Sequence, residues 1–275
     1  MYTQLQQRDS AHPPVTLITL AQMRAAGEKI ACLTAYDASF AALVDAAGAD
    51  VVLVGDSLGM VIQGHDTTVP VTMDQMVYHS AAVARGLQHA FLMTDLPFAS
   101  YTSRDQALTN SVRLMQEGGA RMVKLESGAS QLEIVEYLTS HDIAVCAHLG
   151  LKPQSVHKTG GFRVQGREEQ AAARMIADAR ALEAAGADLL LLECIPASLG
   201  GEITRGVHVP VIGIGAGPDT DGQILVLYDV LDITAGRKPR FVRNFMTGAG
   251  DCGAAVASYM AAVRNGTYPA PEHCF

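Results

Sequence analysis

Short apolar runs that each end on an acidic residue recur along this chain. Four such runs read VVLVGD, FLMTD, RMVKLE and LLLLE, and they close on Asp56, Asp95, Glu126 and Glu193. Three of them follow a Gly and small residues, as in AAGADVVLVGD, GGARMVKLE and AAGADLLLLE, which is how a helix end followed by a buried strand reads. The repetition favours successive αβ units. Parallel strands in such units end at one edge, so we expect the acids to converge there.

The number of apolar runs fits a closed barrel. The predicted strands are residues 30–35, 51–54, 90–95, 121–125, 143–147, 189–192, 210–214 and 224–228. Amphipathic stretches with helical spacing cover residues 39–47, 73–86, 104–117, 131–140, 168–185 and 253–265. The predicted fold is therefore α/β, a single (β/α)8 TIM barrel, with an extra N-terminal helix around residues 19–26 covering its bottom.

Length and composition favour one domain. The chain has 275 residues, 49% of them apolar, and no charge block or low-complexity stretch marks a linker. We expect residues 1–16 to form a flexible extension and residues 17–275 to form the barrel. The formal charge is −8 and the 20 basic residues are scattered, which argues against nucleic acid as a partner.

Neither a membrane segment nor a disulfide framework is indicated. No apolar run approaches the roughly 20 residues that cross a bilayer, and the polar start lacks the apolar region of a secretion signal. The cysteines are Cys32, Cys146, Cys194, Cys252 and Cys274, and no CxxC pair occurs among them. We therefore expect reduced thiols and a cytoplasmic location.

Acids that converge on one edge repel each other unless a divalent cation or a shared proton neutralises them. Asp56 and Ser57 lie together in GDSLGM just beyond a strand, and Asp95 ends a strand before Leu96-Pro97. Hard oxygen ligands of this kind suit Mg²⁺, so the pattern suggests a metal-assisted reaction. The alternative for either aspartate alone is an N-cap of the next helix.

Four polar residues lie on predicted strands or at their ends. Lys124 and Glu126 are two positions apart and share one face of a strand, so Lys124 meets either a carboxylate in an internal salt bridge or an anionic ligand. His148 ends another strand, where a structural hydrogen bond is the simpler role. Glu193 follows four leucines, and burial there raises its pKa toward a value useful for a general base. A metal ligand or a helix cap is the alternative for Glu193.

Three loops are candidates for roles at the mouth of the barrel. Residues 61–73 and 151–167 are long and polar, as mobile lids over a mouth are. The Gly-rich segment GIGAGPDTDG (213–222) either cradles a phosphate or forms a turn required by close backbone packing.

With these residues in place, the chain resembles the ketopantoate hydroxymethyltransferase family over roughly residues 17–275. The matching segments are TAYDASFA, VGDSLGMVIQGHDTTVPVTMD, DLPFASY, MVKLE, HLGLKPQSV, GGFRVQGR, LLECIP, PVIGIGAGPDTDGQILVLYD and YPAPEHCF. The resemblance implies a barrel of the phosphoenolpyruvate/pyruvate class and a homodecamer. It also implies transfer of a hydroxymethyl group from 5,10-methylenetetrahydrofolate to 3-methyl-2-oxobutanoate. The products would be 2-dehydropantoate and tetrahydrofolate, formed through a Mg²⁺-stabilised enolate in pantothenate biosynthesis.

The resemblance also implies residue roles. Asp56 and Asp95 would hold Mg²⁺, with Glu126 binding it directly or through water. Asp56, Ser57, Asp95 and Lys124 would position the oxo acid, and His148 would assist them. Glu193 would be the catalytic base that removes the C3 proton.

Two other functions remain open at this point. A lyase of the same barrel class would cleave a carbon–carbon or carbon–phosphorus bond of an oxaloacetate-like acid with Mg²⁺ and without folate. A barrel without catalytic activity would bind an oxo acid as a sensor or scaffold, although uncompensated carboxylates at the mouth argue against it.

Overall fold

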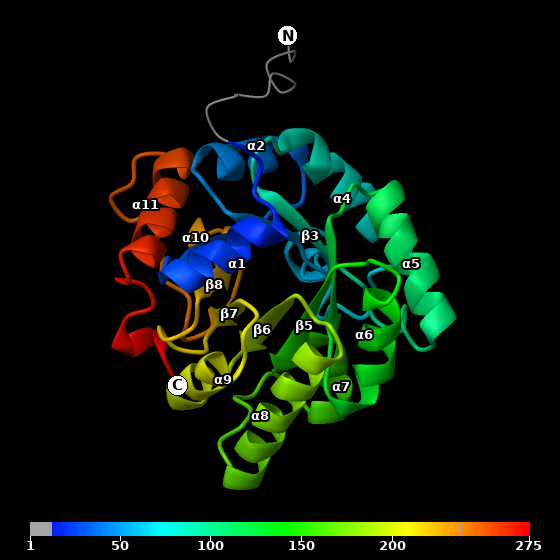
Figure 1. Ribbon diagram of the computed structural model, residues 1–275. Helices are drawn as coiled ribbons and strands as arrows, with labels where there is room; N and C mark the ends of the chain where they lie inside the picture. The colour runs from blue at the N-terminus through cyan, green and yellow to red at the C-terminus, as the bar shows by residue number, and fades with distance from the viewer. Residues whose placement is uncertain (1–12, 237) are drawn as a thin grey trace.

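The centre of the molecule is a closed barrel of parallel strands (Figure 1). The computed structural model describes residues 13–236 and 238–275. The strands are β1 (Ile30–Thr34), β2 (Val51–Val54), β3 (Phe91–Asp95), β4 (Met122–Glu126), β5 (Val145–Gly150), β6 (Leu189–Glu193), β7 (Val211–Ile214) and β8 (Gly222–Leu225). They pair in chain order, and β8 closes the barrel against β1. The predicted (β/α)8 barrel is confirmed.

Helices surround the strands, as Figure 1 shows most clearly for α4, α5, α6 and α8. The longer helices are α1 (Leu17–Ala26), α2 (Ala38–Ala46), α4 (Met73–Gly86), α5 (Arg104–Gln116), α6 (Leu132–Thr139), α8 (Glu169–Ala184), α9 (Ala197–Gly206) and α11 (Cys252–Arg264). Short helical turns are α3 (Leu58–Val61), η2 (Ala129–Gln131), η3 (Pro153–Ser155), α7 (Val156–Thr159), α10 (Leu227–Val230) and η4 (Pro271–His273).

Side-chain oxygens start several of these helices. The Asp37 carboxylate accepts hydrogen bonds from the N–H groups of Ser39 and Phe40 at the start of α2, at 2.8 and 3.0 Å. Thr72 and Gln75 form a reciprocal capping box at the start of α4. Such caps satisfy N–H groups that have no partner inside the helix, which is why the helices begin at these residues.

The apolar side chains form two layers. One cluster fills the barrel and contains Cys32, Leu53, Met93, Leu191 and Ile224 among others. A larger cluster lies between the strands and the surrounding helices. Strands that are buried on both faces need continuous apolar runs, and the runs recognised in the sequence meet this need. The predicted N-terminal helix is confirmed as α1, because its Leu20 is buried within the barrel cluster and covers its bottom.

The sequence prediction was wrong at the eighth strand. Residues 224–228 were expected to be extended, but β8 is Gly222–Leu225 and Leu227–Val230 form the short helix α10. A short apolar run does not by itself distinguish a strand from a buried helical turn. Here the Leu227 N–H donates to Thr34 Oγ1 at 2.9 Å, which ends the strand next to β1. Helix α9 was also not predicted, because its glycines weaken the helical pattern.

Three other predictions bear on the wider molecule. The predicted extension at residues 1–16 lies largely outside the described residues, which begin at 13. All five cysteines are free, as expected. Within residues 13–236 and 238–275, no helix has both the length and the apolar character needed to cross a membrane.

Candidate active site

A cavity of about 680 Å³ opens at the carboxyl ends of the strands. The seven side chains selected from the sequence all line it: Asp56, Ser57, Asp95, Lys124, Glu126, His148 and Glu193. They come from strands or strand ends between β2 and β6, so the parallel arrangement brings together residues that are far apart in the chain. The expected convergence is confirmed, whereas the chemical role of each residue stays a prediction.

Asp56 and Asp95 lie next to each other and are almost fully buried. The Asp56 N–H donates to Asp95 Oδ2 at 3.0 Å. Burial and the charge of Asp95 raise the pKa of Asp56 to about 7. Neither side chain caps a helix, because Ser57 is the residue that precedes α3 and a turn follows β3. The two carboxylates are therefore available to the cavity.

Lys124 connects the aspartates to His148. Its Nζ lies 2.8 Å from Asp95 Oδ1 and 3.4 Å from His148 Nδ1. Burial alone would lower the pKa of Lys124, but the charges of Asp95 and Asp56 outweigh it and hold this pKa above its usual value. Lys124 thus stays charged. Of the two alternatives that the sequence left open for Lys124, the salt bridge to a carboxylate is present, and Lys124 also lines the space where an anionic ligand would bind.

His148 joins Lys124 to Glu193. Burial and the neighbouring Lys124 charge hold the pKa of His148 well below its usual value, so the imidazole is neutral. Because Lys124 donates to Nδ1, the ring proton lies on Nε2, which is 3.2 Å from Glu193 Oε2. In the described structure Nε2 makes no hydrogen bond, so His148 is a neutral neighbour of the Glu193 carboxylate rather than a donor to it.

Glu193 has the properties of a base that works near neutral pH. Burial raises its pKa to about 7, with Lys124 opposing the shift. Local backbone geometry fixes its position. Gly150 of β5 lies against the Glu193 backbone, and a Cβ there would come 2.2 Å from the Glu193 carbonyl oxygen. After Glu193 the chain turns sharply at Cys194, whose φ is 49°.

Glu126 is tied to a residue that sequence reasoning did not select. The Gln154 N–H donates to Glu126 Oε1 at 2.7 Å, and the Gln154 side-chain amide donates to Asp56 Oδ2 at 2.8 Å. Tyr101 donates to Gln154 Oε1 at 2.6 Å. Burial raises the pKa of Glu126 to about 8. The only sequence signal for Gln154 was its place in HLGLKPQSV, because an amide in a loop has no pattern of its own.

Ser57 and the two long loops complete this side of the cavity. Ser57 Oγ lies 2.9 Å from the Tyr36 hydroxyl. The segment 61–73 contributes Val61 and Thr68 to the cavity wall. The segment 151–167 contributes Phe162, Arg163 and other residues. Both candidate lids therefore reach the cavity, and their movement stays a prediction.

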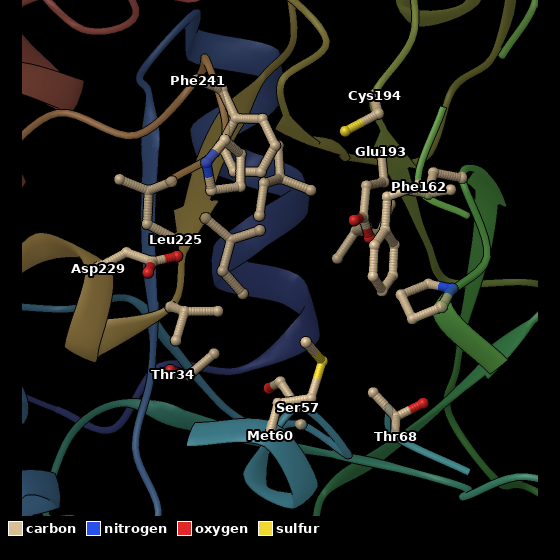
Figure 2. A pocket seen from close by; sticks show the side chains of 18 of the residues that line it. Thr34, Ser57, Met60, Thr68, Phe162, Glu193, Cys194, Leu225, Asp229 and Phe241 are labelled. Carbon is tan, nitrogen blue, oxygen red and sulfur yellow. The ribbon is translucent and has the colours of Figure 1, made fainter. Parts of the chain in front are cut away.

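The wall of the cavity across from Glu193 was not predicted from the sequence. Figure 2 shows Leu225, Asp229 and Phe241 on one side of the cavity, with Phe162 and Glu193 on the other. Residues 234–236 and 238–241 lie in no helix or strand, and no sequence pattern placed them at the mouth. The Gly-rich segment 213–222 packs closely, since a Cβ on Gly217 would come 2.8 Å from the Ala197 backbone. This supports the turn required by packing.

The chemistry of the buried acids fits a divalent cation. Asp56 and Glu126 both have raised pKa values, and Asp95 adds a third buried carboxylate. A cation would relieve the burial of these negative charges. In the part of the chain that the structure describes, no group of three or more His, Cys, Asp or Glu side chains is arranged to hold a metal ion. The predicted Mg²⁺ commonly takes one or two carboxylates and keeps water and substrate as its other ligands, and its binding here stays a prediction.

A barrel with carboxylates, a lysine and a neutral histidine at the carboxyl ends of its strands belongs to the enzymes of the (β/α)8 class. Solved structures share this fold. Phosphonopyruvate hydrolase, in a complex described with oxalate and Mg²⁺, has a TM-score of 0.60 and 13% identity, covering 77% of this chain and 80% of that chain. A 2,3-dimethylmalate lyase of the PEP mutase/isocitrate lyase superfamily has a TM-score of 0.57 and 17% identity, covering 78% and 81%.

Sequence relatives define the family. The family model described as ketopantoate hydroxymethyltransferase matches residues 14–271. The 3-methyl-2-oxobutanoate hydroxymethyltransferase of Alkalilimnicola ehrlichii is 59% identical, covering 95% of each chain. That of Ralstonia nicotianae is 56% identical, covering 98% of this chain and 97% of its own. The chain belongs to the ketopantoate hydroxymethyltransferase family, a family of transferase enzymes whose name places it in pantothenate synthesis.

Proposed function

We propose that this enzyme transfers a hydroxymethyl group from 5,10-methylenetetrahydrofolate to 3-methyl-2-oxobutanoate, forming 2-dehydropantoate and tetrahydrofolate. Family membership supports the oxo acid and the product. The single observation that carries the chemistry is the continuous chain of contacts from Asp95 through Lys124 and His148 to Glu193. These contacts link the proposed anion-binding group, Lys124, to the proposed base, Glu193, within one cavity.

The buried charged side chains have different roles in the proposed reaction. Asp56 and Asp95 would hold Mg²⁺, and Glu126 would bind it directly or through water. Bound there, Mg²⁺ would stabilise negative charge on the oxygens of a 2-oxo acid. Lys124 and Ser57 hold the substrate carboxylate and carbonyl in place from the other side. The positive charge of Lys124 stabilises an anion more strongly here than it would in water, because most water is excluded from the site.

Glu193 removes the C3 proton of the oxo acid, and the neutral imidazole of His148 lies beside its carboxylate. The electron pair left on C3 forms the new carbon–carbon bond to the one-carbon unit. The bonds from that carbon to the two folate nitrogens break and one water molecule supplies the hydroxyl oxygen. The proton taken from C3 and one proton of the water end on the two nitrogens, and tetrahydrofolate leaves. A base with a pKa of about 7 suits this proton transfer at neutral pH. The proposal includes the predicted cytoplasmic location and homodecamer.

A turnover assay with and without 5,10-methylenetetrahydrofolate tests the function. We expect 2-dehydropantoate to form from 3-methyl-2-oxobutanoate only when the folate and Mg²⁺ are both present. Cleavage of an oxaloacetate-like acid without folate would instead identify a lyase. Binding of the oxo acid without any turnover would identify a sensor or scaffold.

Gln154 provides a test of the proposed metal site. We expect Gln154→Ala to raise the Mg²⁺ concentration needed for half-maximal turnover by about 10-fold, because the amide that holds Asp56 Oδ2 is lost. Tyr101→Phe is the matched control, since it removes only the hydroxyl bonded to Gln154 Oε1 and leaves the amide in place. A Mg²⁺ titration of Gln154→Ala that matches the unmodified enzyme would contradict the role of Gln154.

A further inference from the structure

The wall of the cavity beyond β7 and β8 carries groups that the proposed proton transfer does not use. The polar groups of that step all come from the stretch between β2 and β6. In the closed barrel β8 lies between β7 and β1, so its end faces the cavity from the other side. Figure 2 shows Asp229, Leu225 and Phe241 on this side, across the cavity from Glu193. A second reactant that approaches the oxo acid has this wall available to it.

The cavity is larger than a short-chain oxo acid requires. A volume of about 680 Å³ lies in the range of sites that enclose ligands of drug size. Phe162, Phe241 and Phe275 line it together with several aliphatic side chains. Flat, partly aromatic ligands bind well against such surfaces. The space therefore fits a second, larger and flatter reactant beside the oxo acid.

Asp229 is the acidic group of this wall. It lies in α10, is 7% exposed and lines the cavity. Leu227 and Val230 of the same short helix are fully buried, and the Thr34 hydroxyl holds the start of α10 against β1. Burial raises the pKa of Asp229, while Thr234 and Lys238 oppose the shift. Lys238 also pairs with Asp232, so it is shared between two carboxylates.

Aromatic and aliphatic side chains line the cavity on the side of Asp229. Phe241 is buried and packs against Gly215, where a Cβ would come 2.7 Å from the Phe241 ring. Glycine at this position, with φ of 61°, therefore lets the phenylalanine lie over the end of β7. Leu225 adds an aliphatic surface beside it (Figure 2). A carboxylate beside apolar side chains matches a planar heterocycle with two adjacent N–H donors on one edge.

We propose that Asp229 binds the N3–H and 2-amino edge of the pterin ring of the folate co-substrate, with Phe241 and Leu225 against the ring. The two carboxylate oxygens accept the two parallel donors, as they do from a guanidinium group. This inference rests on the proposed function and extends it by assigning a residue to the second substrate.

The charge of the cavity rim agrees with this orientation. A folate carries its carboxylates at the end opposite the pterin ring. Arg163 and Arg240 are exposed and also line the cavity, in a protein whose formal charge is −8. Arg240 is anchored by a hydrogen bond from its Nε to the Glu272 carbonyl at 2.9 Å. With the ring at Asp229, the anionic end meets these exposed cations.

The first test is a steady-state comparison of Asp229→Asn with the unmodified enzyme. We expect the KM for 5,10-methylenetetrahydrofolate to rise about 10- to 100-fold, because an amide does not accept both donors. Exchange of the C3 proton of the oxo acid needs no folate and reports whether the other side of the cavity is intact. Asp232→Asn is the matched control, since it removes a carboxylate that also faces Lys238 but does not line the cavity. An unchanged KM in Asp229→Asn would overturn the proposal.

A folate analogue without the 2-amino group separates direct contact from a structural effect. We expect the unmodified enzyme to bind 2-desamino-tetrahydrofolate about 10-fold or more weakly than tetrahydrofolate in calorimetry. Asp229→Asn should discriminate between the two ligands by less than about 3-fold. Equal binding of both ligands by the unmodified enzyme overturns the inference whether or not the variant folds. If turnover of the unmodified enzyme does not depend on the folate, the proposed function itself is wrong and this inference falls with it.

Discussion

Replacing Glu193 with Gln is expected to slow exchange of the C3 proton of 3-methyl-2-oxobutanoate with solvent by about 100- to 10,000-fold. Glutamine keeps the shape of the side chain but does not take up a proton. The neighbouring groups Lys124 and His148 are unchanged, so Mg²⁺ and the oxo acid should still bind. Loss of the C3 proton signal in D₂O, followed by NMR, measures the exchange, and calorimetry measures binding. Exchange at the normal rate in this variant would remove Glu193 from the role of base.

The pH dependence of exchange gives an independent readout of the same group. The ionised form of Glu193 is the active one, and burial raises its pKa to about 7. The protonated form therefore dominates at lower pH, and the exchange rate should fall about tenfold per pH unit below about pH 7 and level off above it. The pKa of His148 is held well below its usual value, so His148 adds no step in this range. Asp56 and Glu126, with pKa values of about 7 and about 8, titrate in the same range, so the profile is measured at saturating Mg²⁺, which keeps both ionised; there the acid limb should disappear in Glu193→Gln.

Replacing Asp95 with Ala is expected to raise the Mg²⁺ concentration needed for turnover by at least about 100-fold. Asp95 is a proposed ligand, and it also accepts the Asp56 N–H at 3.0 Å and pairs with Lys124 at 2.8 Å. The substitution leaves Lys124 buried without its closest carboxylate. Breaking a buried pair in this way typically costs about 3–5 kcal/mol of folding free energy. Denaturant unfolding without added Mg²⁺ should show this loss.

The variant Asp95→Asn separates the effect on Mg²⁺ binding from the effect on folding stability. It keeps the size of the side chain and an oxygen that accepts the Asp56 N–H, but it removes the negative charge. We expect a Mg²⁺ requirement nearly as high as in Asp95→Ala with a smaller loss of stability, since less space is left unfilled. A normal Mg²⁺ titration in either variant would contradict the assignment of Asp95 as a ligand.

The proton-transfer side of the cavity was accessible to sequence reasoning because its residues sit on regular elements. Asp95, Lys124, Glu126 and Glu193 all lie within strands whose apolar runs are easily recognised. The alternation of side chains along a strand places Lys124 and Glu126 on one face, and both line the cavity. The positions of residues at strand ends can be predicted from the sequence whenever the strands themselves can be recognised.

The contacts between these residues were not accessible in the same way. The sequence left open whether Lys124 meets a carboxylate or a ligand, and it offered no reason to connect Gln154 with Asp56. A single hydrogen bond, such as that from the Gln154 amide at 2.8 Å, depends on the position of a loop to within an ångström. The loop 151–167 has no periodic pattern from which such a position follows.

The cavity wall across from Glu193 was also beyond sequence reasoning, because it is built from several separate segments. With only 5% aromatic residues, the sequence offered no visible ring-binding pocket. Folding brings Phe162 and Phe241 from two separate loops, and Phe275 from the segment after η4, to one cavity. The error at the eighth strand arose nearby, because a buried turn at Leu227–Val230 is as apolar as a strand.

The barrel, the parallel direction of its strands and the gathering of acids at one end follow from the chain's repeated pattern alone. Burial on both faces demands apolar runs, and parallel strands end on the same side, so local periodicity carries this information. The protonation states of Glu193 and His148, the link through Gln154 and the position of Asp229 required the folded molecule. These properties depend on burial and on neighbours far apart in the chain, and no local pattern records them.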